Sequence, residues 1–96
     1  MLILIAGITG NIGRACATHA LSAGHHVRGL GRNPDRLPDS ISAKLDSFVQ
    51  STSYYDVAAL DKACAGGVEA VICAYGPSQE LALDGQLMLL RAAERA

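Results

Sequence analysis

The chain has 96 residues, which is the size of one domain at most. Half of the residues are hydrophobic, 18% are charged and the net charge is −1, so the composition is globular and excludes a strongly disordered chain. Because the charge is near neutral and no apolar run approaches the ~20 residues of a membrane span, we expect neither nucleic acid nor a membrane as a partner.

Four strands are predicted, and they alternate with helices; the first is a continuous apolar run and the fourth is rich in β-branched residues. In chain order the strand candidates are residues 2–6, 26–30, 45–50 and 68–73. The helix candidates are residues 11–23, the short segment 34–37, residues 56–65 and a segment from Ser78 toward the C-terminus. Gly24 is placed to end the first helix, and Asp56 and Ser78 are candidate N-caps. This alternation predicts an α/β fold with a parallel sheet and right-handed crossovers.

Each longer helix is expected to bury one apolar face. In the first helix the expected face consists of Ile12, Ala15, Cys16, His19 and Ala20. In the helix that Asp56 caps, the inward residues are Val57, Leu60 and Cys64. The last helix carries an apolar stripe of Leu83, Leu87, Leu90 and Ala93.

The cysteines give no sign of a metal site or a disulfide framework. Cys16, Cys64 and Cys73 are far apart, odd in number and form no C-x-x-C pair, so we predict no metal. Small buried thiols are typical of a reducing compartment, and we therefore expect a cytoplasmic protein. The apolar start of the chain lacks the basic n-region of a signal peptide and is interpreted as a strand.

The strongest chemical signal is a glycine turn between the first strand and the first helix, with the spacing G-x-x-G-x-x-G. Gly7 allows a sharp turn, Gly10 removes a side chain where the backbone must approach a pyrophosphate, and Gly13 lets the helix lie close to the sheet. The N–H groups of the helix N-terminus would face the phosphates. The predicted cofactor-binding residues here are Gly7, Thr9, Gly10, Asn11, Ile12 and Gly13. A glycine-rich turn without a ligand is the alternative.

The end of the second strand indicates which dinucleotide is bound. An NAD site usually has Asp or Glu there to bind the ribose 2′-OH, whereas this sequence has Arg32 between Gly31 and Asn33. A guanidinium suits a 2′-phosphate, so we predict NADP(H) rather than NAD(H). Arg14 is a candidate for additional charge, and Arg28 is expected to point away from the site or into solvent. A solvated loop residue is the alternative for Arg32.

Residues 7–14 and 27–34 resemble the atypical short-chain dehydrogenase/reductases, and most of all their NmrA-like and isoflavone-reductase-like group. The resemblance implies a Rossmann-type sheet with strand order 3-2-1-4, of which residues 1–96 are the N-terminal part. It also implies that Ala74, Tyr75 and Gly76 line the ribose–nicotinamide side. The family usually has an Asp just after the third strand, where this chain has Gln-Ser-Thr-Ser at 50–53.

The resemblance implies the cofactor-binding part of an NADPH-dependent reductase, an oxidoreductase. A non-catalytic NADP-sensing module of the NmrA-like type is the alternative, because no catalytic residue can be identified in the chain. No tyrosine has a lysine four residues on, and Lys44 and Lys62 lie at positions unlike the family's catalytic lysine. The sequence therefore leaves enzyme and sensor open, and it does not identify a substrate.

A complete sheet of this class needs about six strands, and this chain supplies four. The fourth strand would keep an unpaired apolar edge, which is a liability in water. We therefore expect self-association or a complementing chain at that edge, unless the chain is part of a longer protein.

Overall fold

The structure of the chain, a computed structural model, describes residues 1–51, 56–74 and 86–95. The strands are β1 (Leu2–Ala6), β2 (His26–Gly31), β3 (Ser47–Gln50) and β4 (Ala70–Cys73). The helices are α1 (Asn11–Ser22), the 3-10 turn η1 (Pro34–Arg36), α2 (Asp39–Ser42), α3 (Val57–Cys64) and α4 (Gln86–Arg95).

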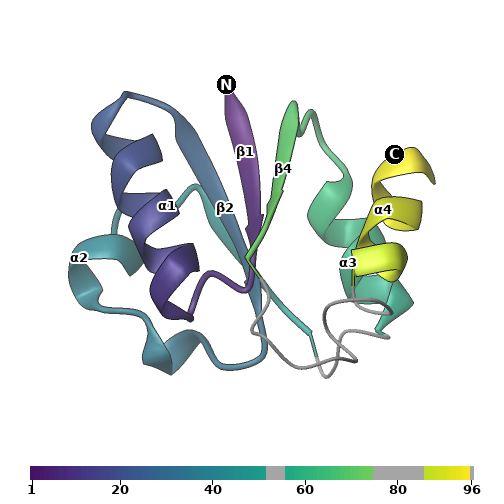
Figure 1. The fold of residues 1–96 in the computed structure, drawn as a ribbon, viewed down its shortest axis with the longest axis horizontal. Coiled ribbons are helices and arrows are strands. Elements are labelled where there is room, and N and C mark those ends of the chain that lie inside the picture. The colour runs from purple at the N-terminus through teal and green to yellow at the C-terminus, as the bar shows by residue number, and fades with distance from the viewer. Residues whose placement is uncertain (52–55, 75–85, 96) are drawn as a thin grey trace.

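The strands form one parallel sheet in the order β3-β2-β1-β4, which confirms the predicted fold class and strand order. The central strand β1 pairs with β2 on one side and with β4 on the other, so Ile5 lies opposite both Gly29 and Ile72. Helices α1 and α2 cover one face of the sheet, and α3 and α4 cover the other (Figure 1). This arrangement follows from right-handed crossovers that run in opposite directions from the centre of the sheet.

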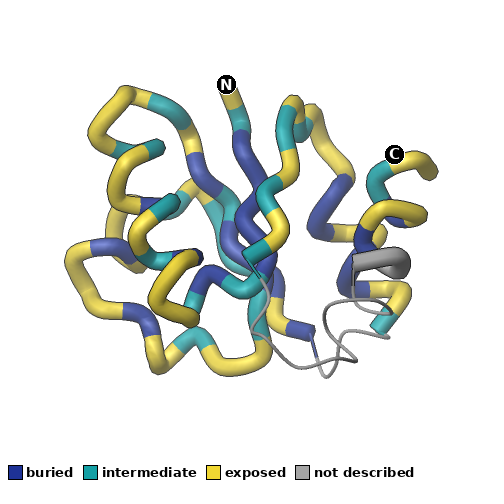
Figure 2. The backbone as a smooth tube through the Cα atoms, in the orientation of Figure 1, coloured by how far each residue is buried: buried dark blue, intermediate teal, exposed yellow. Residues whose placement is uncertain are grey.

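The core has two layers because side chains alternate between the two faces of a strand. Leu4 and Ala6 of β1 pack toward α3 and α4, whereas Ile3 and Ile5 pack toward α1 and α2. The central strands are accordingly the most buried part of the backbone (Figure 2). A strand that is apolar at every position is what such a two-sided core requires.

The buried face of α1 differs from the predicted face. Three of the residues expected to be buried are exposed, namely Ile12, Ala15 and His19. The residues that pack toward the sheet are Gly13, Cys16, Ala17, Ala20 and Leu21. The helix is therefore rotated by about one residue from the predicted orientation. Mainly small residues, rather than its one isoleucine, form the buried face of the helix.

Similar corrections apply to the helices on the other face. In α3, Leu60 and Cys64 are buried as predicted, but Val57 is 42% exposed. In α4 the predicted stripe was wrong at Leu90, which is 54% exposed, and the buried residues are Leu89 and Ala92. The other members of that stripe are Ala93, which is partly buried, and Leu83 and the Leu87 side chain, which lie outside the described residues.

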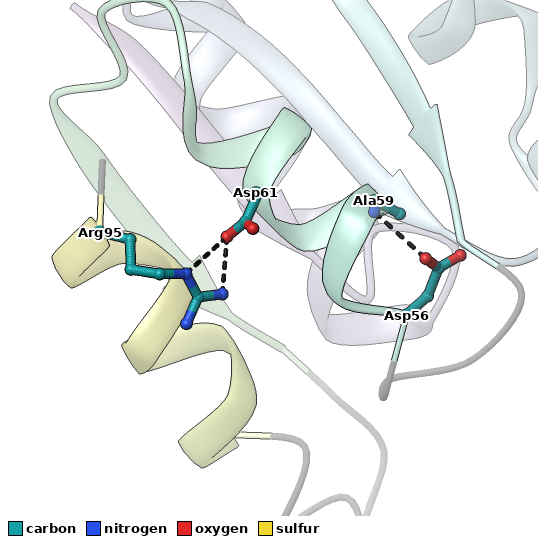
Figure 3. A network of polar contacts seen from close by, with 4 residues as sticks. All are labelled: Asp56, Ala59, Asp61 and Arg95. Carbon is teal, nitrogen blue, oxygen red and sulfur yellow. Dashed lines mark hydrogen bonds and ion pairs between the residues drawn. The ribbon is translucent and has the colours of Figure 1, made fainter.

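Polar contacts fix α3 at its start and against α4 (Figure 3). The Asp56 carboxylate accepts a hydrogen bond from the Ala59 amide at 3.2 Å, so the predicted N-cap is confirmed. The Arg95 guanidinium donates to the Asp61 carboxylate, with Nε at 2.9 Å and Nη2 at 2.6 Å. Both partners of this ion pair are about half exposed, so its contribution to stability is small. Ser78, the other predicted cap, lies outside the described residues.

β4 ends the sheet, and within the described ranges no strand pairs with its outer edge. Next to this edge, an open apolar groove of about 630 Å³ runs between α1 and the sheet. Its lining residues are Ile3, Asn11, Ile12, Ala15, Cys16, His19, Ala20, His25 and Ile72. The exposed face of α1, which was predicted to be buried, and the unpaired edge of β4 are therefore parts of one surface. A search of the described residues finds no helix long and apolar enough to cross a membrane.

Candidate functional site

The glycine turn connects the carboxyl end of β1 to the start of α1 and lies beside the carboxyl end of β2. Gly7 has a φ of +74°, a conformation that residues with a Cβ rarely adopt. Its amide donates to the Leu30 carbonyl at 3.0 Å, and its carbonyl accepts from the Gly10 amide at 3.1 Å. The turn is therefore fixed both to β2 and within itself.

Gly13 and Gly10 have different reasons to be glycine. A Cβ on Gly13 would lie 2.3 Å from the Gly7 carbonyl oxygen and 2.7 Å from the Ile8 Cα, distances that no packed structure allows. A Cβ on Gly10 would lie 3.5 Å from the Gly7 oxygen, which is an ordinary contact. The fold itself thus requires glycine at 13 but not at 10.

The N-terminus of α1 is left open toward solvent. Gly10 is its N-cap residue, with φ −80° and ψ 171°, and no side chain caps the helix. Gly10 and Asn11 are both exposed, so bare backbone borders the first turn, whose N–H groups have no partner inside the helix. The Arg14 guanidinium donates to the Asn11 side-chain oxygen, which holds a positive charge beside this helix end. These features fit an anionic group such as a pyrophosphate.

Thr9 brings the turn into contact with the end of β2. It is half-buried, and a Cβ on Gly31 would lie 3.6 Å from the Thr9 Cγ2 and 3.8 Å from its hydroxyl oxygen. The glycine turn and the segment after β2 are therefore neighbours at the carboxyl edge of the sheet. Ligands of open parallel sheets bind at this edge.

Arg32 follows β2 directly, and its side chain is exposed. Across the described ranges its guanidinium has no hydrogen-bond or ion-pair partner, whereas its backbone is held. The Gln50 side-chain amide donates to the Arg32 carbonyl at 3.1 Å, and the Ser51 amide donates to the Gly31 carbonyl at 2.9 Å. Sequence reasoning treated Gln50 only as a departure from the family pattern and missed this contact. The pairing of Gly31 with Gln50 in a parallel register is the signal that predicts it.

Arg28 points away from the glycine turn, as predicted, but it is half-buried rather than solvated. Its Nε donates to the Ser47 hydroxyl at 3.0 Å, and its Nη1 donates to the carbonyls of Ala63, at 2.8 Å, and Ala65. Arg28 therefore satisfies carbonyl groups at the C-terminus of α3, where a positive charge is favoured.

The segment after β4 is the third side of the predicted site. Ala74 is half-buried, and its amide donates to the Ala6 carbonyl at 2.9 Å, which places it next to the start of the glycine turn. Tyr75 and Gly76 lie outside the described residues, as do Tyr54 and Tyr55. The described residues thus bring together Gly7, Thr9, Gly10, Asn11, Arg32 and Ala74 at one edge of the sheet. Ile12 adjoins them from α1 with its side chain exposed.

Comparison with known proteins gives a consistent result. The family model for NAD(P)H-binding proteins matches residues 7–96. Isoflavone reductase has a TM-score of 0.77 and 27% identity, over 98% of this chain and 32% of that one. A short-chain dehydrogenase/reductase superfamily protein from Agrobacterium tumefaciens with bound NAD has a TM-score of 0.75 and 29% identity, over 100% of this chain and 30% of that one.

A third solved structure, a short-chain dehydrogenase/reductase from Veillonella parvula in complex with NADP, has a TM-score of 0.81. It is 21% identical, over 98% of this chain and 42% of that one, and at this identity the likeness shows the fold alone. The chain spans less than half the length of these solved structures. A search of curated proteins gives no significant match. Since the family model covers nearly every residue, the chain belongs to the NAD(P)H-binding family.

Proposed function

We propose that this chain is the cofactor-binding part of an NADPH-dependent reductase of the atypical short-chain dehydrogenase/reductase type. The observation that carries the proposal is the open N-terminus of α1, which the contact between Gly13 and Gly7 holds at the carboxyl edge of the sheet. A helix start with bare backbone and no side-chain cap is suited to bind a pyrophosphate. The match to the NAD(P)H-binding family model supports the same ligand class.

The choice of NADPH over NADH rests on Arg32. Its exposed guanidinium has no partner within the described part of the chain. Arg32 is the first residue after β2, where the adenosine ribose of a dinucleotide is expected. A 2′-phosphate would accept a bidentate pair of hydrogen bonds from it. Asp35 is the nearest acidic residue in the sequence. Its backbone amide donates a hydrogen bond to the Asn33 side-chain oxygen at the start of η1.

The remaining residues would orient the rest of the cofactor. Thr9, Gly10 and Asn11 would bind the pyrophosphate, while Ala74, Tyr75 and Gly76 would line the ribose–nicotinamide side. When bound, the cofactor supplies the hydride chemistry, and the protein supplies binding and orientation. No residue of this chain is proposed as a general acid or nucleophile.

Isothermal titration calorimetry with NADPH and NADH on the full chain tests this function. We expect NADPH to bind more tightly, and Arg32→Ala to weaken NADPH while leaving NADH unchanged. Arg36→Ala is the matched control, because Arg36 is an exposed arginine of the adjacent 3-10 turn. Equal affinities for the two cofactors in the unchanged chain would refute the role of Arg32. If neither NADPH nor NADH binds, the proposed function itself is refuted.

The alternative, a sensor of the NmrA-like type, shares this binding step and differs in turnover. It is favoured by the sequence of the chain, which has no Tyr-x-x-x-Lys. A sensor would bind NADPH and show no oxidation of it when carbonyl substrates are added. The calorimetric result is the same for both hypotheses. Because no residue of this chain is proposed as catalytic, absorbance of the reduced nicotinamide separates them only when it is followed in a longer protein that contains residues 1–96.

We also propose that the chain associates through the free β4 edge and the groove beside it. Most of the residues that line the groove are apolar, and Ile12 within it is 70% exposed. Large exposed apolar surface next to an unpaired strand favours association. Sedimentation at micromolar concentration tests this: dimers or larger species are expected, with Ile12→Lys shifting them toward monomer. A compact monomer that unfolds cooperatively would refute the proposal.

A further inference from the structure

The loop that carries Arg32 is held at both ends by hydrogen bonds. On the N-terminal side, the side-chain amide of Gln50, in β3, donates to the Arg32 carbonyl at 3.1 Å. On the C-terminal side, the Asn33 side chain accepts from the Asp35 amide at 3.2 Å, and the Asn33 carbonyl accepts from the Arg36 amide at 3.2 Å. Gln50 is thus the side chain that fixes the backbone of Arg32 to the sheet.

The Gln50 contact depends on the register of the sheet. Gln50 is the last residue of β3 and lies opposite Gly31, the last residue of β2. The backbone ladder continues one residue further, with the Ser51 amide on the Gly31 carbonyl. The carbonyl of Arg32, one residue beyond the end of β2, accepts its hydrogen bond from the side chain of Gln50.

Fixing the backbone matters because nothing else among the described residues orients the Arg32 side chain. It is exposed and lacks a partner within the described ranges. A long side chain on a loop that moves would lose more conformational freedom on binding than one on a fixed loop. Any group that holds the Arg32 carbonyl therefore improves the binding of whatever anion the guanidinium contacts.

We propose that Gln50 is a positioning residue for Arg32 and thereby sets the preference of this site for a 2′-phosphorylated dinucleotide. This inference rests on the proposed function, since it concerns the same ligand. It does not require Gln50 to contact the ligand. The effect of Gln50 is expressed only through Arg32.

A double-mutant cycle tests the proposal, with Kd for NADPH and NADH measured by calorimetry on the full chain. Gln50→Met keeps the length of the side chain and removes the donor, and its Kd for NADPH is expected to rise about three-fold, the size of one ordinary hydrogen bond. The Kd for NADH is expected to stay unchanged. In the Arg32→Ala background, the same Gln50→Met change is expected to have no effect on either Kd.

A second variant, Gln50→Glu, places a carboxylate oxygen against the Arg32 carbonyl. It is expected to weaken the binding of NADPH more than Gln50→Met does. Both variants alter an exposed side chain, so thermal unfolding is expected to stay close to that of the unchanged chain. Equal weakening of NADPH and NADH, or an effect that persists without Arg32, would show a general structural role and overturn the inference.

The outcomes also separate this inference from the proposed function. If the unchanged chain binds NADPH and NADH equally, the proposed NADPH preference fails, and the role of Gln50 fails with it. If Arg32→Ala removes the preference but Gln50→Met leaves it at its full size, the proposed function stands and only the positioning role is overturned.

Discussion

Gly13 of α1 lies directly against Gly7 at the end of β1, so close that a Cβ on Gly13 would stand 2.3 Å from the Gly7 carbonyl oxygen. The contact is between backbone atoms, which have no rotamers to move aside. It fixes the distance of α1 from the sheet and also its rotation about its axis. The open start of the helix is therefore held in place by the same residues that form the turn.

The first prediction concerns this contact. Gly13→Ala is expected to destabilise the fold by about 1–3 kcal/mol, because the added methyl forces the turn or the helix to shift. Urea unfolding followed by circular dichroism measures the loss. Gly24→Ala is a poor control, since Gly24 has a φ of +85°. Ser22→Ala, at an exposed position in the last turn of α1 and outside the groove, is a better one and should change little. A Gly13→Ala chain as stable as the unchanged one would show that the turn is softer than its geometry indicates.

The second prediction separates ligand binding from folding at Gly10. A Cβ there meets only an ordinary contact at 3.5 Å, and the residue has an extended backbone that alanine adopts readily. Gly10→Ala is therefore expected to lose less stability than Gly13→Ala, about 1 kcal/mol or less, because alanine is a poorer N-cap than glycine. If the pyrophosphate approaches this backbone, the affinity of the Gly10→Ala chain for NADPH should fall by about ten-fold or more, equivalent to at least ~1.4 kcal/mol. Retention of full affinity would place the phosphates elsewhere.

The architecture was predictable because β1 is a continuous apolar run, β4 is rich in apolar residues, and glycine, proline or a capping residue stands at most of the turns. β1 was predicted with its observed bounds, and Asp56 caps α3 as expected. β3 and β4 begin two residues later than predicted, at Ser47 and Ala70, although Leu45 and Val68 pack against the core. The four-residue helix α2 follows Pro38 and gives too short a pattern to predict.

The rotation of α1 could not be predicted from the hydrophobic pattern, but it could be predicted from the position of Gly13. Ile12 is the largest apolar residue near the start of the helix, so a periodicity argument places it inward, yet it is exposed. The requirement that Gly13 touch the turn places Ala17 inward, one helical turn later. The backbone contact outweighs the side-chain pattern. In the site, similarly, Gln50 is identified by strand register rather than by any motif.

The third prediction concerns Arg28, whose guanidinium contacts Ser47 and the terminal carbonyls of α3. Arg28→Met keeps much of the side-chain volume and removes every donor, and it is expected to destabilise the fold by about 2–3 kcal/mol. NADPH affinity should not change, because these contacts lie away from the glycine turn. Arg95→Met is the matched control: it breaks only the half-exposed pair with Asp61 and should cost less than about 1 kcal/mol. Equal losses in the two variants would contradict the capping role of Arg28.

The last prediction concerns the thiol of Cys64 at the end of α3. Burial raises the pKa of Cys64 above its ordinary value of 9.0, and the nearby Asp61 carboxylate raises it further, while Arg28 and Arg95 oppose the change. A pKa raised in the folded state means that the neutral thiol stabilises the fold. That contribution is fully present below pH 9.0, and it is lost as the pH rises from there through the folded pKa.

Urea-unfolding free energies measured between neutral and alkaline pH check the sign. Above the ordinary pKa of the thiol, the unchanged chain should lose stability more steeply than Cys64→Ala, by at most ~1.4 kcal/mol per pH unit. Asp61→Asn removes the carboxylate that disfavours the thiolate, so the difference should narrow in that background. Parallel curves for the unchanged chain and Cys64→Ala would mean that the thiol titrates alike in the folded and unfolded states, contrary to its burial between α3 and the sheet.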